Sequence, residues 1–257
     1  MLSGLLESFK TKIKNEAVIG IFMKASDPAF VEVAGRSGMD YVILDGEHGP
    51  VGIENMQNLI RAAYVSGVLP IVRVPGTMEH MISQPLDIGA AGVQIPQVRN
   101  ASDIRDAVAA AKFHPLGQRG VCRFVRAAGY SYVPRERYFA EANQTLVIAQ
   151  LEGAEAIRNI DEILDAGGFD ILFIGPYDLS QSLGVTGDVQ NPAVVREMRK
   201  IVEKARAKDV TVGTFVDNAE SLAMWKAEGV RYLSYSVDVG LFYDKCLEVV
   251  NTFYQLK

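Results

Sequence analysis

A buried strand gives way to a charged turn in the stretch Tyr41-Val42-Ile43-Leu44-Asp45-Gly46-Glu47-His48-Gly49. Its first four residues are apolar, and an amphipathic segment follows at about residues 53–65. Three ionisable side chains therefore lie where a strand ends and a helix is expected to begin. Charge at this point adds nothing to a hydrophobic core, whereas catalytic side chains of α/β barrels follow their strands. The stretch predicts an α/β protein whose functional residues lie at strand ends.

The same alternation of strand and helix recurs along the whole chain. Eight short runs, most of them continuously apolar, have the character of parallel strands covered on both faces. They are residues 17–23, 41–45, 70–74, 92–98, 146–151, 171–175, 211–216 and 232–237, and helical patterns lie between them at 29–38, 53–65, 78–88, 102–112, 154–164, 194–208 and 219–228. Eight such units predict a (β/α)8 TIM barrel. The alternative is a doubly wound open sheet, although no GxGxxG follows the first strand.

The two ends of the chain and two long connections stand outside this alternation. Residues 1–15 are predicted to form an extra amphipathic helix, and no composition break divides residues 1–257, so one barrel domain is expected. The tail 241–257 is apolar at intervals, which suits either the last barrel helix or a helix that docks on a neighbouring subunit. The connections 114–142 and 176–191 are long enough to be functional or interfacial.

Composition excludes several classes of protein. The chain has 257 residues, of which 49% are hydrophobic and 22% charged, an ordinary globular balance. Its net charge of -5 argues against a nucleic-acid partner. No signal peptide and no apolar run of membrane length is expected. The two cysteines, Cys122 and Cys246, form no disulfide framework, and we expect a cytoplasmic protein with reduced thiols.

Polar residues follow nearly every predicted strand. In a barrel these strand ends converge on one mouth, so the side chains are expected to share a site. They are Asp45, Glu47, His48, Arg73, Gln94, Gln97, Gln150, Glu152, Tyr177, Asp178, Asp217, Ser234, Ser236 and Asp238.

Glu152 and Asp178 are the candidate metal ligands. Each comes just after an apolar strand, and the two strands are consecutive. Two carboxylates without a thiolate or a paired histidine suit a hard cation such as Mg²⁺ or Mn²⁺. The three histidines show neither HxH nor HExxH spacing, which argues against zinc. The alternative is that both acids cap the helices that follow them, and spacing alone does not decide between these interpretations.

Arg73 lies inside a strand, where a guanidinium is costly to bury without a partner. Its planar fork suits the carboxylate or carbonyl group of a substrate at the barrel mouth. The alternative is an internal salt bridge to Glu47 or Glu152, and both interpretations can hold together.

His48 is the candidate general base, with Asp45 expected to fix its tautomer and raise its basicity. The alternative is a loop histidine bonded to backbone. His114 is expected in a loop and His80 on a helix surface. No lysine clearly ends a strand, which disfavours a Schiff-base aldolase, and Lys24 comes nearest to that position.

Gly175 and Pro176 stand beside Asp178 where a strand ends. Glycine allows a ligand to approach the backbone closely, so this segment is a candidate to present an N–H to an anionic group. A tight turn without ligand contact is the alternative.

With these residues in view, the chain resembles the HpcH/HpaI family of metal-dependent, class II pyruvate aldolases. Six segments carry the resemblance in the same order along the chain: LDGEHGP (44–50), PIVRV (70–74), LDIGA (86–90), GQRGV (117–121), QLE (150–152) and FIGPYDLS (173–180). The resemblance spans residues 19–242 and is most specific in the first and last of these segments.

The resemblance implies a barrel that assembles as a hexamer, a trimer of dimers, and exchanges its last helix between subunits. It implies a divalent ion (Mg²⁺, Mn²⁺ or Co²⁺) held by Glu152 and Asp178. His48 would be the base with Asp45 in support. The keto acid would meet three groups: Arg73, Gln150, and the backbone around Gly175 and Pro176. Asp87 resembles the family's aspartate that reaches a neighbouring subunit's site.

The implied activity is reversible cleavage of a 4-hydroxy-2-oxo acid, such as a 2-keto-3-deoxy sugar acid or a 4-hydroxy-2-oxo-diacid, into pyruvate and an aldehyde. Alternatives are a citrate-lyase-like enzyme acting on a thioester, a phosphoenolpyruvate-type mutase, or a non-catalytic barrel. Two departures bear on the aldehyde: residues 122–126 read CRFVR where relatives often carry small residues, and Phe22 stands where some carry tryptophan. The segment 122–126 is expected to shape the aldehyde side of the site.

Overall fold

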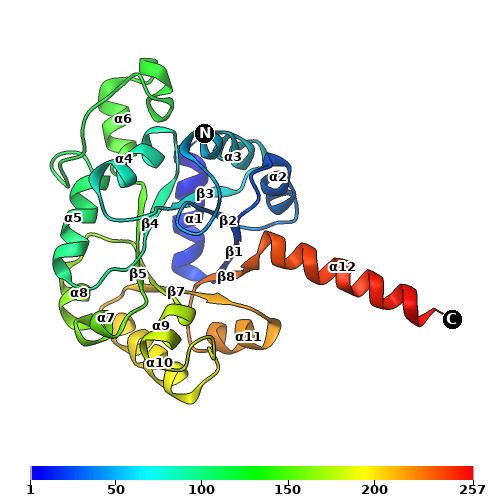
Figure 1. Cartoon of the computed structure of the whole chain (residues 1–257). Coiled ribbons are helices and arrows are strands. Elements are labelled where there is room, and N and C mark those ends of the chain that lie inside the picture. The colour runs from blue at the N-terminus through cyan, green and yellow to red at the C-terminus, as the bar shows by residue number, and fades with distance from the viewer. Residues whose placement is uncertain (1, 257) are drawn as a thin grey trace.

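Eight parallel strands close into a barrel in which each strand pairs with the next and β1 pairs with β8 (Figure 1). The computed structural model describes residues 2–256. The strands are β1 (Val18–Met23), β2 (Tyr41–Asp45), β3 (Leu69–Arg73), β4 (Gly92–Ile95), β5 (Leu146–Leu151), β6 (Ile171–Ile174), β7 (Thr211–Val216) and β8 (Tyr232–Val237). The predicted (β/α)8 barrel is confirmed.

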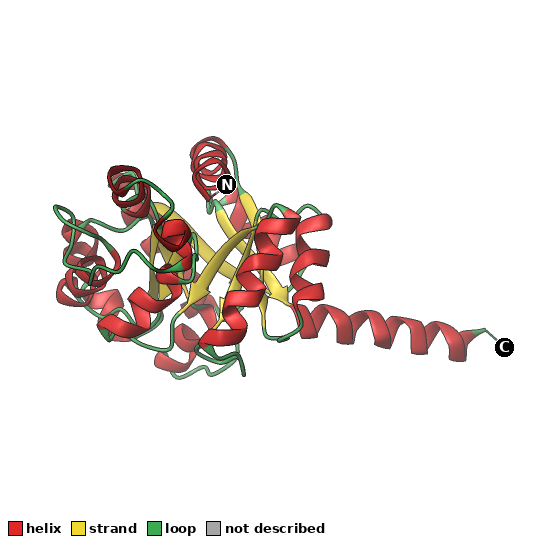
Figure 2. Ribbon diagram, turned by 90° about the horizontal axis from the view of Figure 1, so that it is seen from above, coloured by secondary structure: helices red, strands yellow, loops and turns green. Residues whose placement is uncertain are grey.

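Helices surround the barrel on its outer face (Figure 2). They are α1 (Leu2–Asn15), α2 (Pro28–Arg36), α3 (Ile53–Ser66), α4 (Glu79–Asp87), α5 (Ala101–Ala111), η1 (Arg126–Ser131), α6 (Arg135–Ala142), α7 (Ala154–Arg158), α8 (Ile160–Ala166), α9 (Pro176–Ser182), α10 (Pro192–Ala207), α11 (Ala219–Ala227) and α12 (Asp238–Gln255). The helix expected over 154–164 is two helices that meet at Asn159, and both long connections contain helical turns.

Helix entries follow local capping chemistry. The Asp27 side chain accepts from Ala29 N–H at the start of α2, with Pro28 at the first helical position. Asn191 does the same for Ala193 N–H ahead of α10. The side-chain oxygen of an N-cap residue accepts from a backbone N–H that has no partner inside the helix. Proline at the first helical position loses no hydrogen bond, because the N–H of that position would have no helical partner. Both Asx-Pro pairs, Asp27-Pro28 and Asn191-Pro192, therefore start helices.

The barrel interior is sealed at the end where the strands begin. Leu6, Phe9 and Ile13 of α1 pack against the interior side chains. The rings of Tyr41 and Tyr232 stack there with centroids 4.0 Å apart, and Phe9 meets Tyr41 edge-on at 5.9 Å. With this end filled by apolar side chains, polar groups inside the barrel gather at the opposite end, where the strands finish.

The last helix, α12, extends away from the barrel (Figures 1 and 2). Its exposed apolar side chains include Phe242, Tyr243, Leu247, Val250 and Phe253. Only its beginning touches the body of the protein, where Phe242 meets Phe30 with ring centroids 6.4 Å apart. Across residues 2–256, no helix has the combination of length and apolar character that crossing a membrane requires.

Candidate active site

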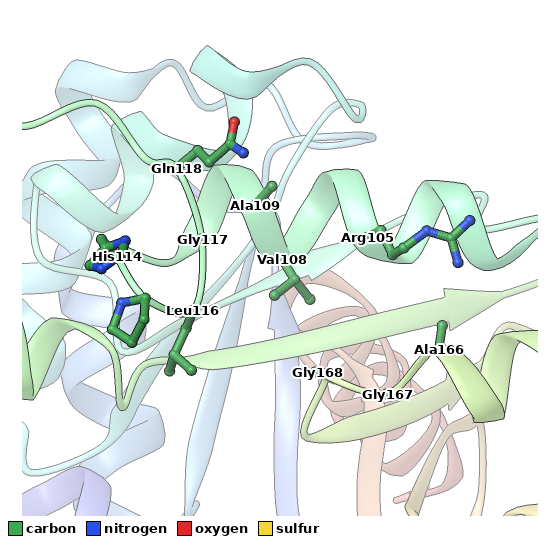
Figure 3. Close-up of a pocket in the computed structure, with 11 residues that line it drawn as sticks. Arg105, Val108, Ala109, His114, Leu116, Gly117, Gln118, Ala166, Gly167 and Gly168 are labelled. Carbon is green, nitrogen blue, oxygen red and sulfur yellow. The ribbon is translucent and has the colours of Figure 1, made fainter.

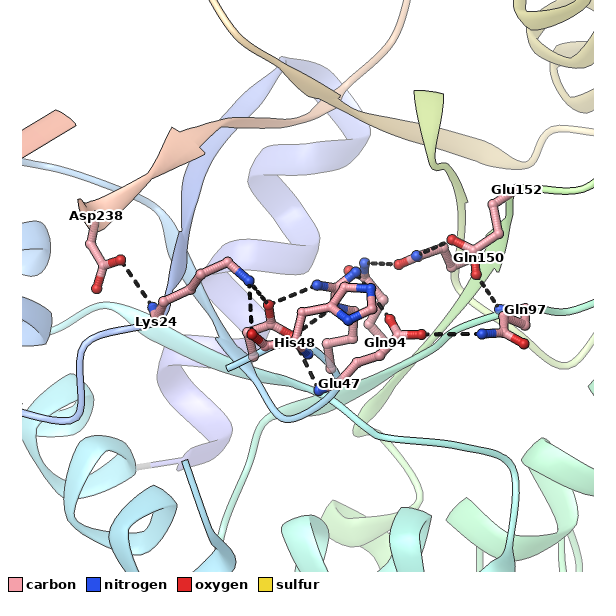
Figure 4. Close-up of polar contacts among 10 residues, drawn as sticks. Lys24, Glu47, His48, Gln94, Gln97, Gln150, Glu152 and Asp238 are labelled. Carbon is pink, nitrogen blue, oxygen red and sulfur yellow. Dashed lines mark hydrogen bonds and ion pairs between the residues drawn. The ribbon is translucent and has the colours of Figure 1, made fainter. Parts of the chain in front are cut away.

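A cavity of about 320 Å³ opens at the mouth of the barrel, where the strands end. Phe22, Phe173, Tyr177, Phe215 and Val237 form its apolar wall, and Lys24, His48, Arg73, Gln150 and Asp178 form its polar wall, with Gly175 and Pro176 completing the lining. A concave site with an apolar wall and a few convergent polar groups is typical of small-molecule binding. Figure 4 shows Lys24, Glu47, His48, Gln94, Gln150 and Glu152 in a row across the mouth.

Asp45 lies at the centre of this row and is fully buried. Its Oδ1 accepts from Arg73 Nε at 2.9 Å and from the backbone N–H groups of Glu47 and His48, both at 3.1 Å. Its Oδ2 accepts from Arg73 Nη2 at 2.7 Å and from Lys24 Nζ at 2.6 Å. The prediction that Asp45 orients the His48 imidazole is wrong, because both oxygens are engaged elsewhere and His48 reaches Asp45 through its backbone.

These contacts decide the charge of the Asp45 carboxyl. Burial by itself raises the pKa of Asp45. The hydrogen bonds and charge of Arg73, followed by those of Lys24, outweigh that effect and hold the pKa well below its ordinary value. Asp45 is therefore a carboxylate throughout the neutral range, and it fixes two cations at the mouth.

Arg73 is 8% exposed and lines the cavity from the end of β3. Besides Asp45, it has Glu47 as a partner, with Nη1 lying 3.1 Å from Glu47 Oε2. Its guanidinium also lies over the Phe22 ring at 4.9 Å. Both predicted alternatives for Arg73 are therefore observed: it forms the internal salt bridge to Glu47, and it lines the cavity. Contacts with Asp45, Glu47 and Phe22 hold its guanidinium in place.

Two glycines let the turn after β2 fold this tightly. A Cβ on Gly49 would lie 2.2 Å from the Asp45 carbonyl oxygen, and one on Gly46 would lie 2.7 Å from the Arg73 carbonyl oxygen. Backbone atoms cannot give way at such distances. Gly46 and Gly49 are therefore the residues that bring Glu47 and His48 over the carboxylate of Asp45.

Glu152 and Asp178 follow consecutive strands, β5 and β6, and the charge of Asp178 acts on the Glu152 carboxyl. Glu152 is 7% exposed, and its Oε1 accepts from Gln97 N–H at 2.7 Å while its Oε2 accepts from Gln150 Nε2 at 2.5 Å. Since the bond from Gln97 comes from another loop and α7 starts after Gly153, Glu152 does not cap that helix. The capping interpretation is thus excluded for Glu152.

The surroundings of Glu152 carry an excess of negative charge. Burial, together with the neighbouring carboxylates Glu47 and Asp178, raises the pKa of Glu152 to about 7 against the opposing hydrogen bonds from Gln150 and Gln97. Like charges held together in this way suit a site that receives a cation. Within residues 2–256, no three His, Cys, Asp or Glu side chains are grouped as a metal site. The donor set that the protein offers is this pair of carboxylates.

Gly175 packs directly beside Glu152. A Cβ on Gly175 would lie 3.0 Å from Glu152 Oε2, so a larger residue would press on the carboxylate. The Gly175 N–H already donates to Leu151 O at 2.9 Å, and Pro176 has no N–H. A backbone donor for an anionic ligand would therefore come from Tyr177 or Asp178, whose N–H groups lie in the first turn of α9.

Lys24 is a mouth residue that the sequence-based prediction passed over. Besides Asp45, its Nζ donates to His48 O at 3.3 Å. The Asp238 carboxylate accepts from the backbone N–H groups of Lys24 at 3.0 Å and Ala25 at 2.8 Å, which fixes the loop after β1 (Figure 4). Its position directly after β1 is that of a strand-end residue, which is the feature by which the sequence could have assigned it to the mouth.

Comparison with known proteins agrees with this arrangement. Residues 18–244 match the family model described as HpcH/HpaI aldolase/citrate lyase. The chain belongs to this family. It is 34% identical over 246 residues to a 2-keto-3-deoxy-L-rhamnonate aldolase of Escherichia coli O17:K52:H18, covering 93% of this chain and 90% of that protein.

Two solved structures extend the comparison. An HpcH/HpaI aldolase/citrate lyase family protein from Burkholderia cenocepacia J2315 superposes with a TM-score of 0.91 at 27% identity, covering 96% of this chain and 99% of that one. The citrate synthase SbnG superposes with a TM-score of 0.87 at 31% identity, covering 96% and 97%. The family's barrel thus serves proteins with two differently named activities.

Asp87, the residue that resembles the family's intersubunit aspartate, lies at the end of α4, away from the mouth of its own barrel. Its Oδ1 accepts from Arg119 Nη2 at 2.5 Å, and Arg119 is itself 3% exposed. Within one subunit, Asp87 is therefore no part of the mouth.

The connection between α5 and β5 also starts and ends at the opposite end of the barrel from the mouth. The lining of the mouth cavity contains no residue of 113–145. Residues 122–126 therefore do not line this cavity, and their role on the aldehyde side stays a prediction. His114 begins this connection and is exposed, as expected of a loop histidine. It lines a separate cavity of about 390 Å³ with Arg105, Val108 and Gly168 (Figure 3).

Proposed function

We propose that this protein is a divalent-metal-dependent aldolase. It would cleave a 4-hydroxy-2-oxo acid, such as a 2-keto-3-deoxy sugar acid or a 4-hydroxy-2-oxo-diacid, reversibly into pyruvate and an aldehyde. One observation carries the proposal: a fixed arginine, an exposed imidazole and the carboxylate of Asp178 line one cavity in the barrel mouth, and the buried carboxylate of Glu152 lies close behind them, hydrogen-bonded to the lining residue Gln150. The name of the E. coli relative supports a keto-deoxy sugar acid as substrate.

Glu152 and Asp178 would hold the metal, which when bound would act as a Lewis acid toward the keto group of the substrate. Arg73 would bind the oxygens of the keto acid and stabilise the negative charge that develops there. Asp45 is a positioning residue in this scheme, because it acts through Arg73 and Lys24. Gln150 would orient Glu152 through their hydrogen bond, and the N–H groups of Tyr177 and Asp178, which follow Gly175 and Pro176, would receive the carboxylate of the substrate.

His48 would take the proton from the C4 hydroxyl of the substrate. The electron pair of that O–H bond forms the aldehyde carbonyl, the C3–C4 bond breaks, and its electrons pass into the enolate of pyruvate. Return of a proton to C3 completes the cycle. The aromatic wall of Phe22, Phe173 and Phe215 would exclude water from the developing charge, which strengthens its contacts with Arg73.

Stripping the metal is expected to abolish turnover. Pyruvate release from 2-keto-3-deoxy-L-rhamnonate, followed by reduction of the pyruvate with NADH, should fall by at least about a hundredfold after chelation, as for other lost transition-state charge contacts. Mg²⁺, Mn²⁺ and Co²⁺ should then restore it to different extents. Full activity of the stripped protein would contradict the metal role.

A second candidate is a citrate-type carbon–carbon lyase or synthase that uses a thioester, favoured by the likeness to SbnG. A thioester carried on a nucleotide needs a basic groove beside the mouth. Five arginines lie in the range 119–137, but they belong to the α5–β5 connection and none of them lines the mouth cavity. Citrate formation from oxaloacetate and acetyl coenzyme A, without pyruvate release from hydroxy-oxo acids, would select this candidate.

The proposal extends to assembly. The whole chain, 1–257, would be one domain of a cytoplasmic hexamer in which α12 crosses to a neighbouring subunit and Asp87 approaches a neighbouring site. The exposed apolar side chains of α12 support this proposal, since long apolar faces of soluble proteins are ordinarily covered. The exposed thiols of Cys122 and Cys246 suit a reducing compartment.

The assembly has its own test. Replacing Phe253 or Val250 by aspartate is expected to reduce the molar mass measured by light scattering, because each charge would enter an apolar interface. The Leu116→Asp variant, at an exposed apolar position outside α12, should keep the wild-type mass. Unchanged mass in both α12 variants would contradict helix exchange.

A further inference from the structure

A cavity of about 660 Å³ lies on the flank of the barrel and shares no lining residue with the mouth. It is enclosed by α3, the turn between α4 and β4, η1 and α6. Gly89, Ala90 and Thr145 in its wall precede β4 and β5, which places it toward the end of the barrel opposite the mouth. Its volume is that of a small-molecule site. The proposed aldolase reaction gives this cavity no role.

Four arginines line the cavity, and two of them lack an acidic partner among residues 2–256. Arg119 is paired with Asp87 and Arg137 with Glu141. Arg61 donates only to the neutral side chains of Asn58 and Gln57, at 2.5 and 2.6 Å.

Arg126 donates to the Ile88 carbonyl at 3.1 Å and lies over the Tyr64 ring at 5.3 Å. Burial lowers the pKa of Arg126, and the charge of Arg61 lowers it further against the opposing effect of Tyr64. The cavity therefore holds uncompensated positive charge, which an anion would neutralise.

Two buried polar atoms of the lining are left without a partner in the described structure. The Arg119 Nε belongs to a side chain 3% exposed, and the Tyr138 Oη to one 2% exposed. Buried donors without acceptors are uncommon, and each costs about 1–3 kcal/mol. Both side chains line the cavity, so two polar groups without a partner lie in or directly behind its wall.

Apart from Glu141, which is paired with Arg137, and Thr145, the rest of the wall is largely apolar, with Tyr64, Val65, Leu86 and Val133 among its residues. We propose that this flank cavity binds a small organic anion in which a phosphate or carboxylate is attached to a planar apolar body. Guanidinium groups recognise both anions through paired N–H donors. The apolar side chains and the Tyr64 ring accommodate the body of the ligand.

Calorimetric titration of the native full-length protein tests the proposal with three probes: phenyl phosphate, benzoate and inorganic phosphate. Phenyl phosphate or benzoate is expected to bind, and whichever binds more tightly identifies the anionic group. Inorganic phosphate should bind more weakly than phenyl phosphate because it lacks the apolar body. Absence of binding by all three probes, or equal binding of phosphate and phenyl phosphate, would overturn the proposal.

Variants locate the binding. Arg126→Met should weaken it by about thirtyfold or more, as for one lost partner of a buried charge contact. Tyr138→Phe, which removes only the unpartnered hydroxyl, should weaken it while leaving the fold intact. Arg196→Met, at an exposed arginine on α10, and Arg73→Ala, at the mouth, should bind as the wild type does. Unchanged affinity in both cavity variants, or loss of binding in Arg73→Ala, would assign the anion elsewhere.

Discussion

Replacing Arg73 by alanine is expected to lower kcat/KM for cleavage of a 4-hydroxy-2-oxo acid by at least about a hundredfold, the usual loss for one preorganised charge contact. A guanidinium has five N–H donors. All three nitrogens of the Arg73 guanidinium are directed at Asp45 and Glu47, so the group is already oriented before a substrate arrives. Its charge then acts where the enolate forms, without reorganisation.

The division of the loss between kcat and KM tells what Arg73 does. A contact made mainly in the transition state lowers kcat, whereas equal binding of ground and transition states raises only KM. Arg73→Lys keeps the charge but loses the fork, and we expect it to fall between the wild type and alanine.

The alanine variant also removes a partner of the buried Asp45, so its thermal unfolding must be measured beside its activity. Arg99→Ala is the matched control, because Arg99 pairs with Asp103 on the surface with 62% of its side chain exposed. A near-wild-type rate for a folded Arg73→Ala would show that Arg73 serves only the fold.

The fold could be predicted from the sequence because most strands are short, continuously apolar runs bounded by turn residues. Every predicted strand overlaps an observed one. The division of the predicted helix 154–164 into α7 and α8 at Asn159 could not be predicted, since the apolar residues continue on both sides of Asn159. Helix α6 was missed for a different reason. Its sequence RERYFAEA has almost no apolar periodicity, and it forms because Tyr138 and Ala142 dock against Phe113.

The residues that lie at the mouth could be predicted in the same way, because the ends of barrel strands converge whatever side chains they carry. The hydrogen bonds and ion pairs that these side chains form with one another could not be predicted. Asp45 is only three residues from His48 in the sequence, yet its carboxylate meets Arg73 at the end of the next strand and Lys24 just after the previous one. Those neighbours follow from barrel closure and strand register, where Asp45 lies opposite Arg73.

Replacing Asp45 by asparagine is expected to lower the free energy of unfolding at pH 7 by about 3–5 kcal/mol, the cost of breaking a buried ion pair from one side. Asparagine keeps the shape of the side chain but leaves Arg73 and Lys24 facing a neutral oxygen. Lys24→Met should cost less, because the bidentate contact with Arg73 survives and Lys24 is 28% exposed.

The pH dependence of this loss has a defined sign. The pKa of Asp45 is held below its ordinary value in the folded protein, so its stabilisation is fully present above the unfolded pKa of about 3.9 and disappears as the pH falls toward the folded pKa. The difference in unfolding free energy between wild type and Asp45→Asn should therefore be constant near neutrality and narrow below about pH 5.

Urea unfolding at a fixed protein concentration, repeated between neutral and acidic pH, measures this difference. Asp165→Asn is the surface control, since Asp165 pairs with Lys208 while 68% exposed, and its difference from wild type should stay near zero at every pH. A gap between wild type and Asp45→Asn that persists unchanged into acid would show that the lost stability comes from packing or hydrogen bonding. A gap that narrows in acid would show that the lost stability comes from the attraction between the Asp45 carboxylate and the cations Arg73 and Lys24. The same attraction orients the candidate catalytic arginine.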